Sequence, residues 1–593
     1  MTARKYQTEP KHRIPFTNLT EEQIIKKLKA ALNGPPCQSA FSTTLAGTSL
    51  RVITDPAPTS EHPGPTLVYK FHNNRDMSVS INGKAAVKTG YGALELKQLL
   101  LISHLVPGTT RGYNIVIDRH AGMATVFETW FGAGFDPQIN RREVQRQIYY
   151  GYVDNGGTSP GGRHHLTNRI EGKGIYWKQD NGVETLDFYC SIVSSIFIEL
   201  TRSGGELAFC APADYIMIND HQFIYSRAEA ELGGIFTLYI LDLHAMEQAG
   251  VRLGFDEHDK LEYYMFRGEG EVTGQIATFE EFGNNGEKIP YGDRQRPTEP
   301  GMRLVYRPLR TFPVMTDAEV KDQALNHAHA FGEGEGSGAG GMGGYKTELV
   351  DKLIGKSLTI RMDNNGPAIE YIFDELRKLR WRYEGDSNWR KDSYEAYEPD
   401  DELYFFAHFL DAEYPRSCAM VALDMKTGLS TLLKGTTGTP YRNNETHPTY
   451  YFGIFEMEGI IPPHYHRHGW TDELVGEAAT WNYQPGKGGL SSMHVYATPN
   501  TYSWTIFMPD GSLGMQWSSP AWYSKLRDDV YIMSWVEEAC NGTLGVICFN
   551  RRTMHDAGFG YHVGPNGLSL SVIGARARHA GKFNIEKYLG PKV

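Results

Sequence analysis

A carboxylate and several aromatic residues recur on neighbouring predicted strands near the C-terminal end of the chain. Glu537 follows a predicted strand that carries Trp535, and Tyr502 and Trp504 stand on another. Burial among apolar rings raises the pKa of a carboxyl group, which makes it available for proton transfer near neutral pH. The pattern predicts an acid/base pocket that needs no cofactor. A carboxylate at a strand end that faces water is the competing interpretation.

Two histidines complete this predicted pocket. His408 stands in the apolar run YFFAHFLD, as His104 does in LLISHLV, and His494 alternates with Tyr496. Imidazole changes its charge near neutral pH and so suits acid/base catalysis, although a core histidine with a satisfied hydrogen bond is the alternative. We assign catalysis to Glu537, His408, His494 and Tyr496, and substrate binding to Tyr502, Trp504, Trp535, Arg416 and His468. Arg416 is included because a guanidinium can bind a carboxylate through two hydrogen bonds.

The densest polar cluster is IPPHYHRHGWTDE, in which His464, His466 and His468 alternate. Alternate side chains of an extended segment share a face, so three imidazoles could meet a divalent metal. No carboxylate partner is evident, and a solvated loop is the interpretation we favour, with no metal. Only His468 has a counterpart, His164, earlier in the chain.

The elements that must position these residues are mainly strands. Apolar and polar residues alternate from Tyr502 to Met508 and from Val530 to Ser534, which is typical of antiparallel strands with one face in water. One amphipathic helix is predicted between Thr17 and Asn33.

The chain also repeats itself at an offset of about 300 residues. LAGTSL from Leu45 returns as LIGKSL from Leu353, and GPTLVYKF from Gly64 returns as GPAIEYIF from Gly366. The repeat continues into the predicted pocket, where Glu229 matches Glu537, while Asp187, Phe197 and Arg227 stand in place of His494, Trp504 and Trp535. The aromatic pocket is therefore predicted in the second copy, because the first copy has fewer aromatic residues at these positions and an added charge at Arg227.

Four motifs in fixed order carry a family resemblance. They are ELVG after Thr471, HVYATPNTYSW, VYIMSWVEEACNGTLGV and GFGYHVG, spread over about 85 residues. This stretch resembles the C-terminal domain of the MoaF family, named for molybdenum cofactor biosynthesis and related to the calycin β-barrels. The resemblance implies a mainly β fold of tandem calycin- or lipocalin-like antiparallel barrels. Phenolic acid decarboxylases, which are similar small barrels that use Tyr, Arg and Glu without a cofactor, supply an analogy at the level of the fold.

The repeat and the resemblance together predict the domain organisation. We expect an N-terminal helical extension at 1–44, barrels at 45–150 and 151–300, a linker at 301–345, and barrels at 346–445 and 446–593. The linker contains FGEGEGSGAGGMGG, from Phe331 to Gly344, which is too rich in glycine to pack a core and is expected to be an exposed, flexible tether.

Composition excludes several classes of function. A net charge of -11 disfavours nucleic-acid binding, which depends on clustered Lys and Arg. The six cysteines form no CxxC pair, and no apolar window reaches the ~18 residues of a membrane span, so we expect a cytoplasmic protein with no membrane partner. No feature of the sequence sets an oligomeric state.

These features converge on one functional hypothesis. The chain is predicted to be a cofactor-independent lyase or isomerase/cyclase that acts on a hydrophobic, aromatic small molecule in secondary metabolism, by acid/base chemistry in a barrel pocket. A non-catalytic small-molecule carrier is the first alternative, since a carrier needs only apolar lining and shape. A metal-dependent enzyme at His464, His466 and His468 is the second.

Overall fold

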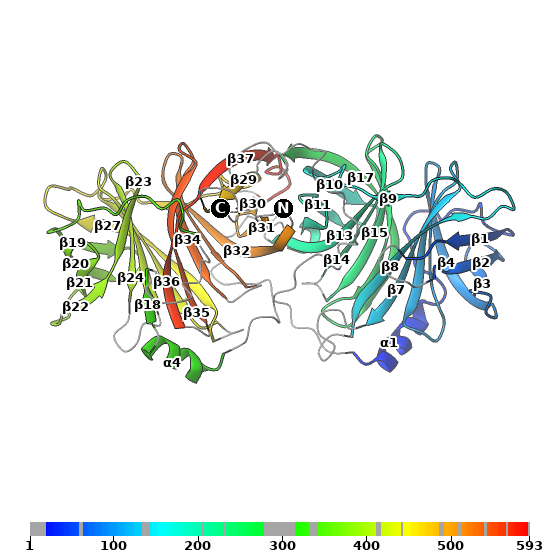
Figure 1. Ribbon diagram of the computed structural model, residues 1–593, viewed down its shortest axis with the longest axis horizontal. Coiled ribbons are helices and arrows are strands. Elements are labelled where there is room, and N and C mark those ends of the chain that lie inside the picture. Colours follow the sequence, from blue (N-terminus) through cyan, green and yellow to red (C-terminus); the bar gives the residue numbers. More distant parts are fainter. Residues whose placement is uncertain are drawn as a thin grey trace. The chain divides into compact units, whose positions relative to one another are not determined.

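The structure is a computed structural model that describes residues 19–57, 63–132, 141–203, 207–229, 233–277, 315–326, 328–331, 342–410, 417–439, 443–484, 491–507, 513–538, 542–564 and 567–590. The chain divides into two compact units, an N-terminal unit within Arg13–Thr278 and a C-terminal unit within Arg307–Val593. Strands make up most of both units (Figure 1). The mainly β fold predicted from the sequence is confirmed.

The N-terminal unit begins with a short helix, α1 (Glu21–Leu28), followed by a 3-10 turn, η1 (Lys29–Ala31). Thr20 caps the helix: its hydroxyl accepts the N–H of Gln23, whose side chain accepts the N–H of Thr20 in return. Ile24 and Leu28 are buried against the strands that follow. This is the helix that the sequence predicts.

The first sheet of the N-terminal unit closes into a barrel. β1 pairs with both β2 and β8, so the sheet has no free edge. Its strands are β1 (Ser49–Thr54), β2 (Thr66–Phe71), β3 (Asp76–Ile81), β4 (Val87–Leu96), β5 (Leu99–Leu105), β6 (Arg111–Asp118), β7 (Met123–Gly132) and β8 (Glu143–Val153).

A second closed sheet completes the N-terminal unit, because β10 pairs with both β11 and β17. The elements are β9 (His165–Leu166), β10 (Lys173–Gln179), β11 (Glu184–Phe188), β12 (Ser194–Glu199), α2 (Leu200–Ser203), β13 (Phe209–Met217), β14 (Gln222–Glu229), β15 (Ile235–Asp242), β16 (Glu247–Phe255) and β17 (Leu261–Ile276).

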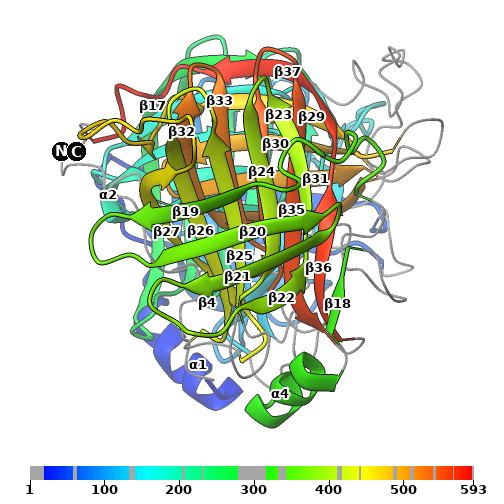
Figure 2. The same ribbon diagram turned by 90° about the vertical axis from the view of Figure 1, so that its left-hand side faces the viewer.

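The C-terminal unit starts with α4 (Asp317–Asn326) and a short strand, β18 (Ala328–Ala330), which lies parallel to β36 (Figure 2). Its first sheet has its edges at β22 and β23, which only Tyr394 separates. The strands are β19 (Ser357–Met362), β20 (Ala368–Glu375), β21 (Lys378–Tyr383), β22 (Arg390–Ser393), β23 (Glu395–Asp400), β24 (Leu403–Phe409), β25 (Ser417–Asp424), β26 (Leu429–Thr437) and β27 (Thr446–Glu456).

The second sheet of the C-terminal unit also wraps around a core. β29 pairs with β30 and β37, and β35 pairs with β36 and, at one position, with β37. The strands are β28 (Gly469–Trp470), β29 (Glu477–Asn482), β30 (Ser491–Thr498), β31 (Thr501–Phe507), β32 (Leu513–Arg527), β33 (Val530–Val536), β34 (Leu544–Asn550), β35 (His555–Gly564), β36 (Gly567–Ile573) and β37 (Arg576–Phe583).

The two units repeat one order of strands. β22 with β23 takes the place of β4, and β36 with β37 takes the place of β17. The register agrees residue by residue: Asp187 lies opposite Phe197 as His494 lies opposite Trp504. The structure therefore supports the internal duplication that the sequence indicates.

Within each unit the two barrels pack against each other through an apolar core. In the C-terminal unit, Phe405 of β24 packs on Phe559 of β35, with ring centroids 5.3 Å apart. All seven residues of β33 are buried as a result. The prediction that one face of this strand lies in water is wrong. One face points into the lumen, and the neighbouring barrel covers the other.

Part of the segment predicted as a linker is ordered structure. α4 and β18 lie within 301–345, Phe331 packs against Phe559, and the Gly344 N–H donates to the carbonyl of Tyr483. The described ends of the predicted tether are thus held against the barrel, and residues 332–341 lie outside the described part of the chain. Among the described helices, none has the length and apolarity that crossing a membrane requires.

Candidate functional site

The inner wall of the β29–β37 barrel is lined with aromatic rings. Strand alternation turns these side chains inward while their neighbours face the adjoining barrel. Cross-strand pairing sets His494, Trp504 and Trp517 side by side on β30, β31 and β32. The other buried aromatic residues of this lumen are Trp481, Tyr483, Tyr496, Tyr502, Tyr523, Tyr531, Trp535 and Phe549.

Some polar side-chain atoms in this lumen form hydrogen bonds within the protein. The Trp504 indole N–H donates to Ser519 Oγ at 3.0 Å, and the Trp535 indole N–H donates to Glu537 Oε1 at 2.7 Å. His494 Nε2 lies 2.9 Å from Ser492 Oγ. Glu537 is half-buried and oriented by Trp535, so the predicted neighbourhood of Glu537 and the aromatic residues exists.

Other polar tips on the same wall have no hydrogen-bond partner among the described residues. They are Nε1 of Trp481, Nε1 of Trp517, Nδ1 of His494 and the hydroxyl of Tyr496. Trp481 and Tyr496 approach each other without reaching hydrogen-bond geometry. Each residue is at most 5% exposed. An unsatisfied buried polar group costs about 1–3 kcal/mol, so a wall with several of them is suited to a bound molecule or ordered water.

The opposite wall adds two more such groups. His562 on β35 and Ser569 on β36 alternate with residues that pack outward, such as Tyr561 and Leu568, and therefore face the lumen. His562 Nδ1 and Ser569 Oγ also lack a hydrogen-bond partner in the described part of the chain.

Burial shifts the protonation of three groups in this lumen. Asp556 accepts the N–H of Ala575 at 2.6 Å, and its burial raises its pKa to about 8. Burial lowers the pKa of His494 to about 3 and that of His562 to about 4. At neutral pH the lumen therefore contains a largely protonated carboxyl and two neutral imidazoles, a combination that can both donate and accept a proton.

The sequence interpretation missed Asp556, His562 and Ser569. Asp556 and His562 are separated by Gly558 and Gly560, so their strand lacks the alternating apolar pattern that marks an inward face. The only available signal was the match between AMEQAG at Ala245 and TMHDAG at Thr553 in the repeat.

The equivalent lumen in the N-terminal unit is filled by a chain of ion pairs. Arg227 Nη1 lies 2.5 Å from Asp187 Oδ1, and Arg227 Nε lies 2.9 Å from Glu229 Oε1. Arg252 Nη1 lies 2.8 Å from the same Glu229 oxygen, and Arg252 Nε lies 2.7 Å from Glu262 Oε2. The two arginine side chains are 2% and 6% exposed. Burial raises the pKa of Glu229, but Arg252 and Arg227 outweigh this effect and hold it below its usual value. Each charged side chain of this chain thus has an oppositely charged partner, although Glu229 Oε2 and Arg252 Nη2 make no hydrogen bond within the described residues.

The duplication shows what replaces this chain in the C-terminal unit. By strand register, Asp187, Arg227, Glu229, Arg252 and Glu262 correspond to His494, Trp535, Glu537, Gly560 and Ser569. Both guanidinium groups are gone, and one of their positions is a glycine. The same fold thus carries one lumen with a chain of ion pairs and one in which neutral, aromatic and small side chains replace most of that chain.

His408 does not join this site. It lies on β24 in the barrel of β19–β27, with Nε2 3.1 Å from the Tyr371 hydroxyl and Nδ1 3.5 Å from Asp392 Oδ2. His104 makes the same 3.1 Å contact with Tyr69 in the N-terminal unit. The expectation of one pocket shared by His408, Tyr496 and Glu537 is therefore wrong, because alternation gives the face of a strand but not the barrel to which that face belongs.

The three alternate histidines do not converge either. His464 and His466 are exposed, whereas His468 is buried with Nδ1 2.8 Å from Thr431 Oγ1, as His164 is with Thr125. Within the described residues, no group of three His, Cys, Asp or Glu side chains could hold a metal ion. This geometry removes the basis for a metal-dependent enzyme at the histidine cluster.

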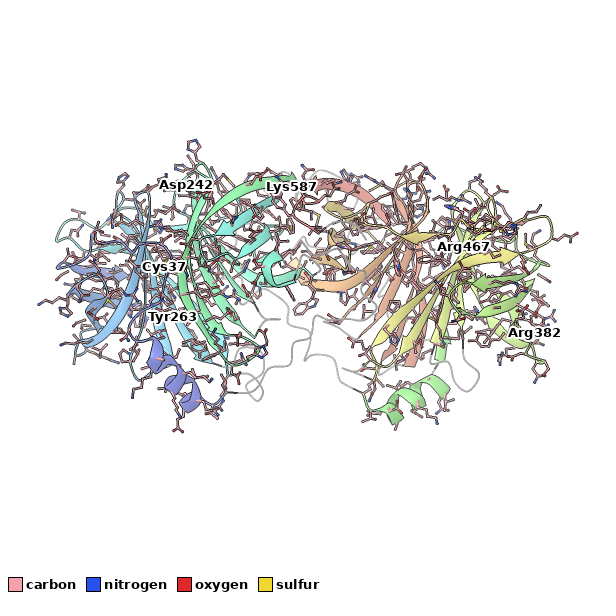
Figure 3. All side chains as sticks on the ribbon, turned by 180° about the vertical axis from the view of Figure 1, so that it is seen from behind. Cys37, Asp242, Tyr263, Arg382, Arg467 and Lys587 are labelled. Atoms are coloured by element: carbon pink, nitrogen blue, oxygen red, sulfur yellow. The ribbon has the colours of Figure 1, made fainter. Side chains whose placement is uncertain are left out.

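The loop around these histidines explains their separation. Only Gly469 and Trp470, beyond His468, form a strand, so the alternation does not place the side chains on one face. Arg467, labelled in Figure 3, holds the loop through Asp363 at 2.8 Å. His468 accordingly fixes a barrel junction outside the lumen, away from Tyr502 and Trp504. Arg416 lies outside the described residues.

Comparison with known families identifies the C-terminal unit. The MoaF N-terminal domain matches residues 336–438, and the MoaF C-terminal domain matches residues 468–582. The C-terminal unit therefore belongs to the MoaF family, with both of its domains present. The MoaF C-terminal match contains both walls of the lumen with unpaired polar atoms, from Trp481 on β29 to Ser569 on β36.

Other comparisons add little to the MoaF assignment. No curated protein matches the chain. One similar solved structure is a protein of unknown function of the DUF3598 family from Nostoc punctiforme, with 9% sequence identity, 39% of this chain and 96% of that chain covered, and a TM-score of 0.21.

Proposed function

We propose that this chain is a cofactor-independent lyase or isomerase/cyclase that acts on a hydrophobic, aromatic small molecule in the lumen of the β29–β37 barrel. One observation carries the proposal: this lumen combines an aromatic wall with buried neutral polar atoms that lack partners among the described residues, whereas the equivalent lumen of the N-terminal unit is occupied by a chain of ion pairs. These polar atoms are therefore available to form hydrogen bonds with a bound molecule.

Acid/base roles follow from the groups on the two walls. Asp556 on β35, protonated at neutral pH, is the proton donor, and His494 on β30, neutral at the same pH, is the acceptor. Lyase and isomerase reactions need both, because a proton is removed from one atom and delivered to another. Glu537, fixed by Trp535 at 2.7 Å, is a second carboxylate beside the aromatic wall. Tyr502 and Trp535, with ring centroids 5.5 Å apart, hold an aromatic substrate.

The proposed setting is cytoplasmic secondary metabolism. Among the described cysteines, Cys37, Cys190, Cys418 and Cys548 are free thiols, which suits a reducing compartment.

A carrier of the same molecule is the second candidate. The aromatic wall and the unpaired donors of Trp481 and Trp517 are sufficient for binding without any chemistry. The two candidates differ in Asp556 and His494, which a carrier does not need for proton transfer.

A variant that copies the N-terminal lumen into the C-terminal one tests the proposal. H494D/W535R/G560R/S569E restores the ion-pair set around Glu537 that the N-terminal unit accommodates in the same fold. We expect the neutral fluorescent probe N-phenyl-1-naphthylamine to bind the wild-type chain and to lose at least about tenfold in affinity for this variant. The exposed substitution H466A is the control and should bind as the wild type does. Equal binding by all three proteins contradicts the lumen as the site.

Turnover separates the enzyme from the carrier. A small-molecule extract is incubated with wild-type protein or with D556N and analysed by mass spectrometry. The enzyme predicts a compound that the wild type consumes and D556N leaves intact, while both still bind the probe. Consumption at equal rates by both proteins contradicts the role of Asp556.

A further inference from the structure

We infer that the ligand of the β29–β37 lumen is a neutral aromatic molecule with a carbonyl or similar acceptor oxygen, and that carboxylates are excluded. This inference rests on the function proposed above and narrows its substrate class. Three features of the lumen support it: the kind of unpaired atoms, the pairing of the nearby cations Lys525 and Arg551 with carboxylates of the protein, and the glycine in its wall at Gly560.

The unpaired atoms of one wall include two that can only donate. An indole N–H has no acceptor capacity, so Trp517 Nε1 needs an acceptor from the ligand or from water, whereas Trp481 Nε1 has the Tyr496 hydroxyl nearby. The hydroxyl of Tyr496, on β30, can also donate. A hydrocarbon ligand would leave these donors unsatisfied, whereas a ligand oxygen accepts from them.

Lys525, opposite Tyr531 at the end of β32, stands at a lumen-facing position, but its Nζ lies 2.9 Å from Glu473 and 3.0 Å from Asp528 and its side chain is 32% exposed. Arg551, in the turn after β34, lies 2.6 Å from Glu477, and its side chain is 37% exposed. His494 and His562 are buried and neutral at pH 7. A buried carboxylate without a cation loses its hydration and gains no partner, which disfavours an anionic ligand strongly.

The lumen wall has its least side-chain volume at Gly560, close to the unpaired atoms of His562 on β35 and Ser569 on β36. Gly560 replaces Arg252, and a Cβ at Gly560 would have Ser571 Oγ as its nearest neighbour at 3.0 Å and the next atoms at 3.9 Å. A Cβ at Gly545 would instead meet the Trp535 ring at 2.4 Å. The aromatic ring of Trp535 is thus pressed against its own wall, and the glycine wall is the side left for the ligand.

A matched series of three naphthalenes tests the inference. 2-Acetylnaphthalene carries an acceptor oxygen, 2-ethylnaphthalene lacks it, and 2-naphthoate carries a charge, while ring and size are nearly constant. Each displaces N-phenyl-1-naphthylamine from the wild-type chain at pH 7. We expect the ketone to bind about 10-fold more tightly than the hydrocarbon and about 100-fold more tightly than the carboxylate.

The substitution W517F links this preference to one donor. Phe209 occupies the equivalent position in the N-terminal unit, so the fold accepts phenylalanine there. We expect W517F to lose most of the preference for the ketone and to bind 2-ethylnaphthalene as the wild type does. If W517F does not fold by circular dichroism, Y496F removes a hydroxyl from the same wall and takes its place.

The outcomes separate the inference from the proposed function. Equal affinity for ketone and hydrocarbon, or tight binding of 2-naphthoate, overturns the inference; if binding is still lost in H494D/W535R/G560R/S569E, the lumen remains the proposed site. An unchanged ketone preference in both W517F and Y496F overturns the assignment of the donors. Failure of the probe and of all three naphthalenes to bind the wild type overturns the proposed function, and the inference with it.

Discussion

Asp556 gives the most quantitative prediction, because its burial acts on stability with a defined sign. Its pKa is raised from 3.8 to about 8 in the folded chain. The folded state therefore holds a proton that the unfolded state releases as the pH rises above 3.8. Stability attributable to this group is greatest at low pH and falls progressively up to about pH 8.

The magnitude follows from the shift. Each pH unit in this interval changes the free energy of unfolding by about 1.36 kcal/mol, so wild type loses about 4 kcal/mol between pH 5 and pH 8 through this one carboxyl. Asparagine has nearly the same shape, stays neutral, and its oxygen can still accept the N–H of Ala575. D556N should be more stable than wild type at pH 8, and this advantage should shrink by about 4 kcal/mol towards pH 5.

Urea unfolding followed by tryptophan fluorescence at pH 5, 6, 7 and 8 measures the effect. Five of the ten tryptophans, Trp481, Trp504, Trp517, Trp522 and Trp535, lie in this barrel, so the signal reports on its unfolding. D351N, at an exposed position, is the control and should differ from wild type by less than about 0.5 kcal/mol at every pH. A D556N variant that is less stable than wild type at pH 8, or whose difference does not vary with pH, refutes the reasoning.

Three further predictions concern single side chains. H468Q should lower the free energy of unfolding, measured in urea, by about 1–3 kcal/mol because the hydrogen bond to Thr431 is lost. The exposed substitution H466A should lower it by less than about 0.5 kcal/mol. Equal losses in the two variants would contradict the buried structural role of His468. Burial lowers the pKa of His468 to about 4, so wild type loses stability as the pH falls from 6.5 to 4, and H468Q should lack this slope. R227A should destabilise the N-terminal unit by about 3–5 kcal/mol because two carboxylates remain buried without their shared cation; thermal unfolding showing no loss would contradict the ion-pair chain. E537Q should lower turnover about 100-fold with little change in probe affinity if Glu537 transfers a proton, and full activity would exclude that role.

The alternation of apolar residues predicted antiparallel strands, the family resemblance predicted barrels, and the repeat predicted two similar units. Matching Asp187 with His494 and Arg227 with Trp535 from sequence motifs agrees with the strand register of the structure. This works because side chains of a strand alternate with period two, and a register error of one residue would turn the apolar set outward.

The assembly of the pocket could be predicted only in part. Tyr496, Tyr502, Trp504, Trp535 and His494 do line one lumen, with Glu537 beside it. His408 was grouped with them because imidazole suits acid/base chemistry, but its strand belongs to the other barrel of the unit. A local sequence pattern does not show to which barrel a strand belongs. The long-range partners of His408, Tyr371 and Asp392, are what place it.

Local periodicity also misjudged the histidine loop. His464, His466 and His468 alternate as a strand would, but the described backbone there is not a strand, and one member turns inward to Thr431. The partner lies 37 residues earlier in the chain, so its contact is invisible to a pattern with a short window.

The central claim is that the C-terminal unit carries a ligand in a lumen that the N-terminal unit fills with its own charges. Crystals of the full chain soaked with 6-bromo-2-acetylnaphthalene test it directly, because the anomalous scattering of bromine locates the molecule. The account predicts a bromine peak inside the β29–β37 barrel, near Trp517 and Gly560, and none inside the β10–β17 barrel. A peak among Asp187, Arg227 and Arg252, or peaks only on the outer surface of the barrels, would contradict it.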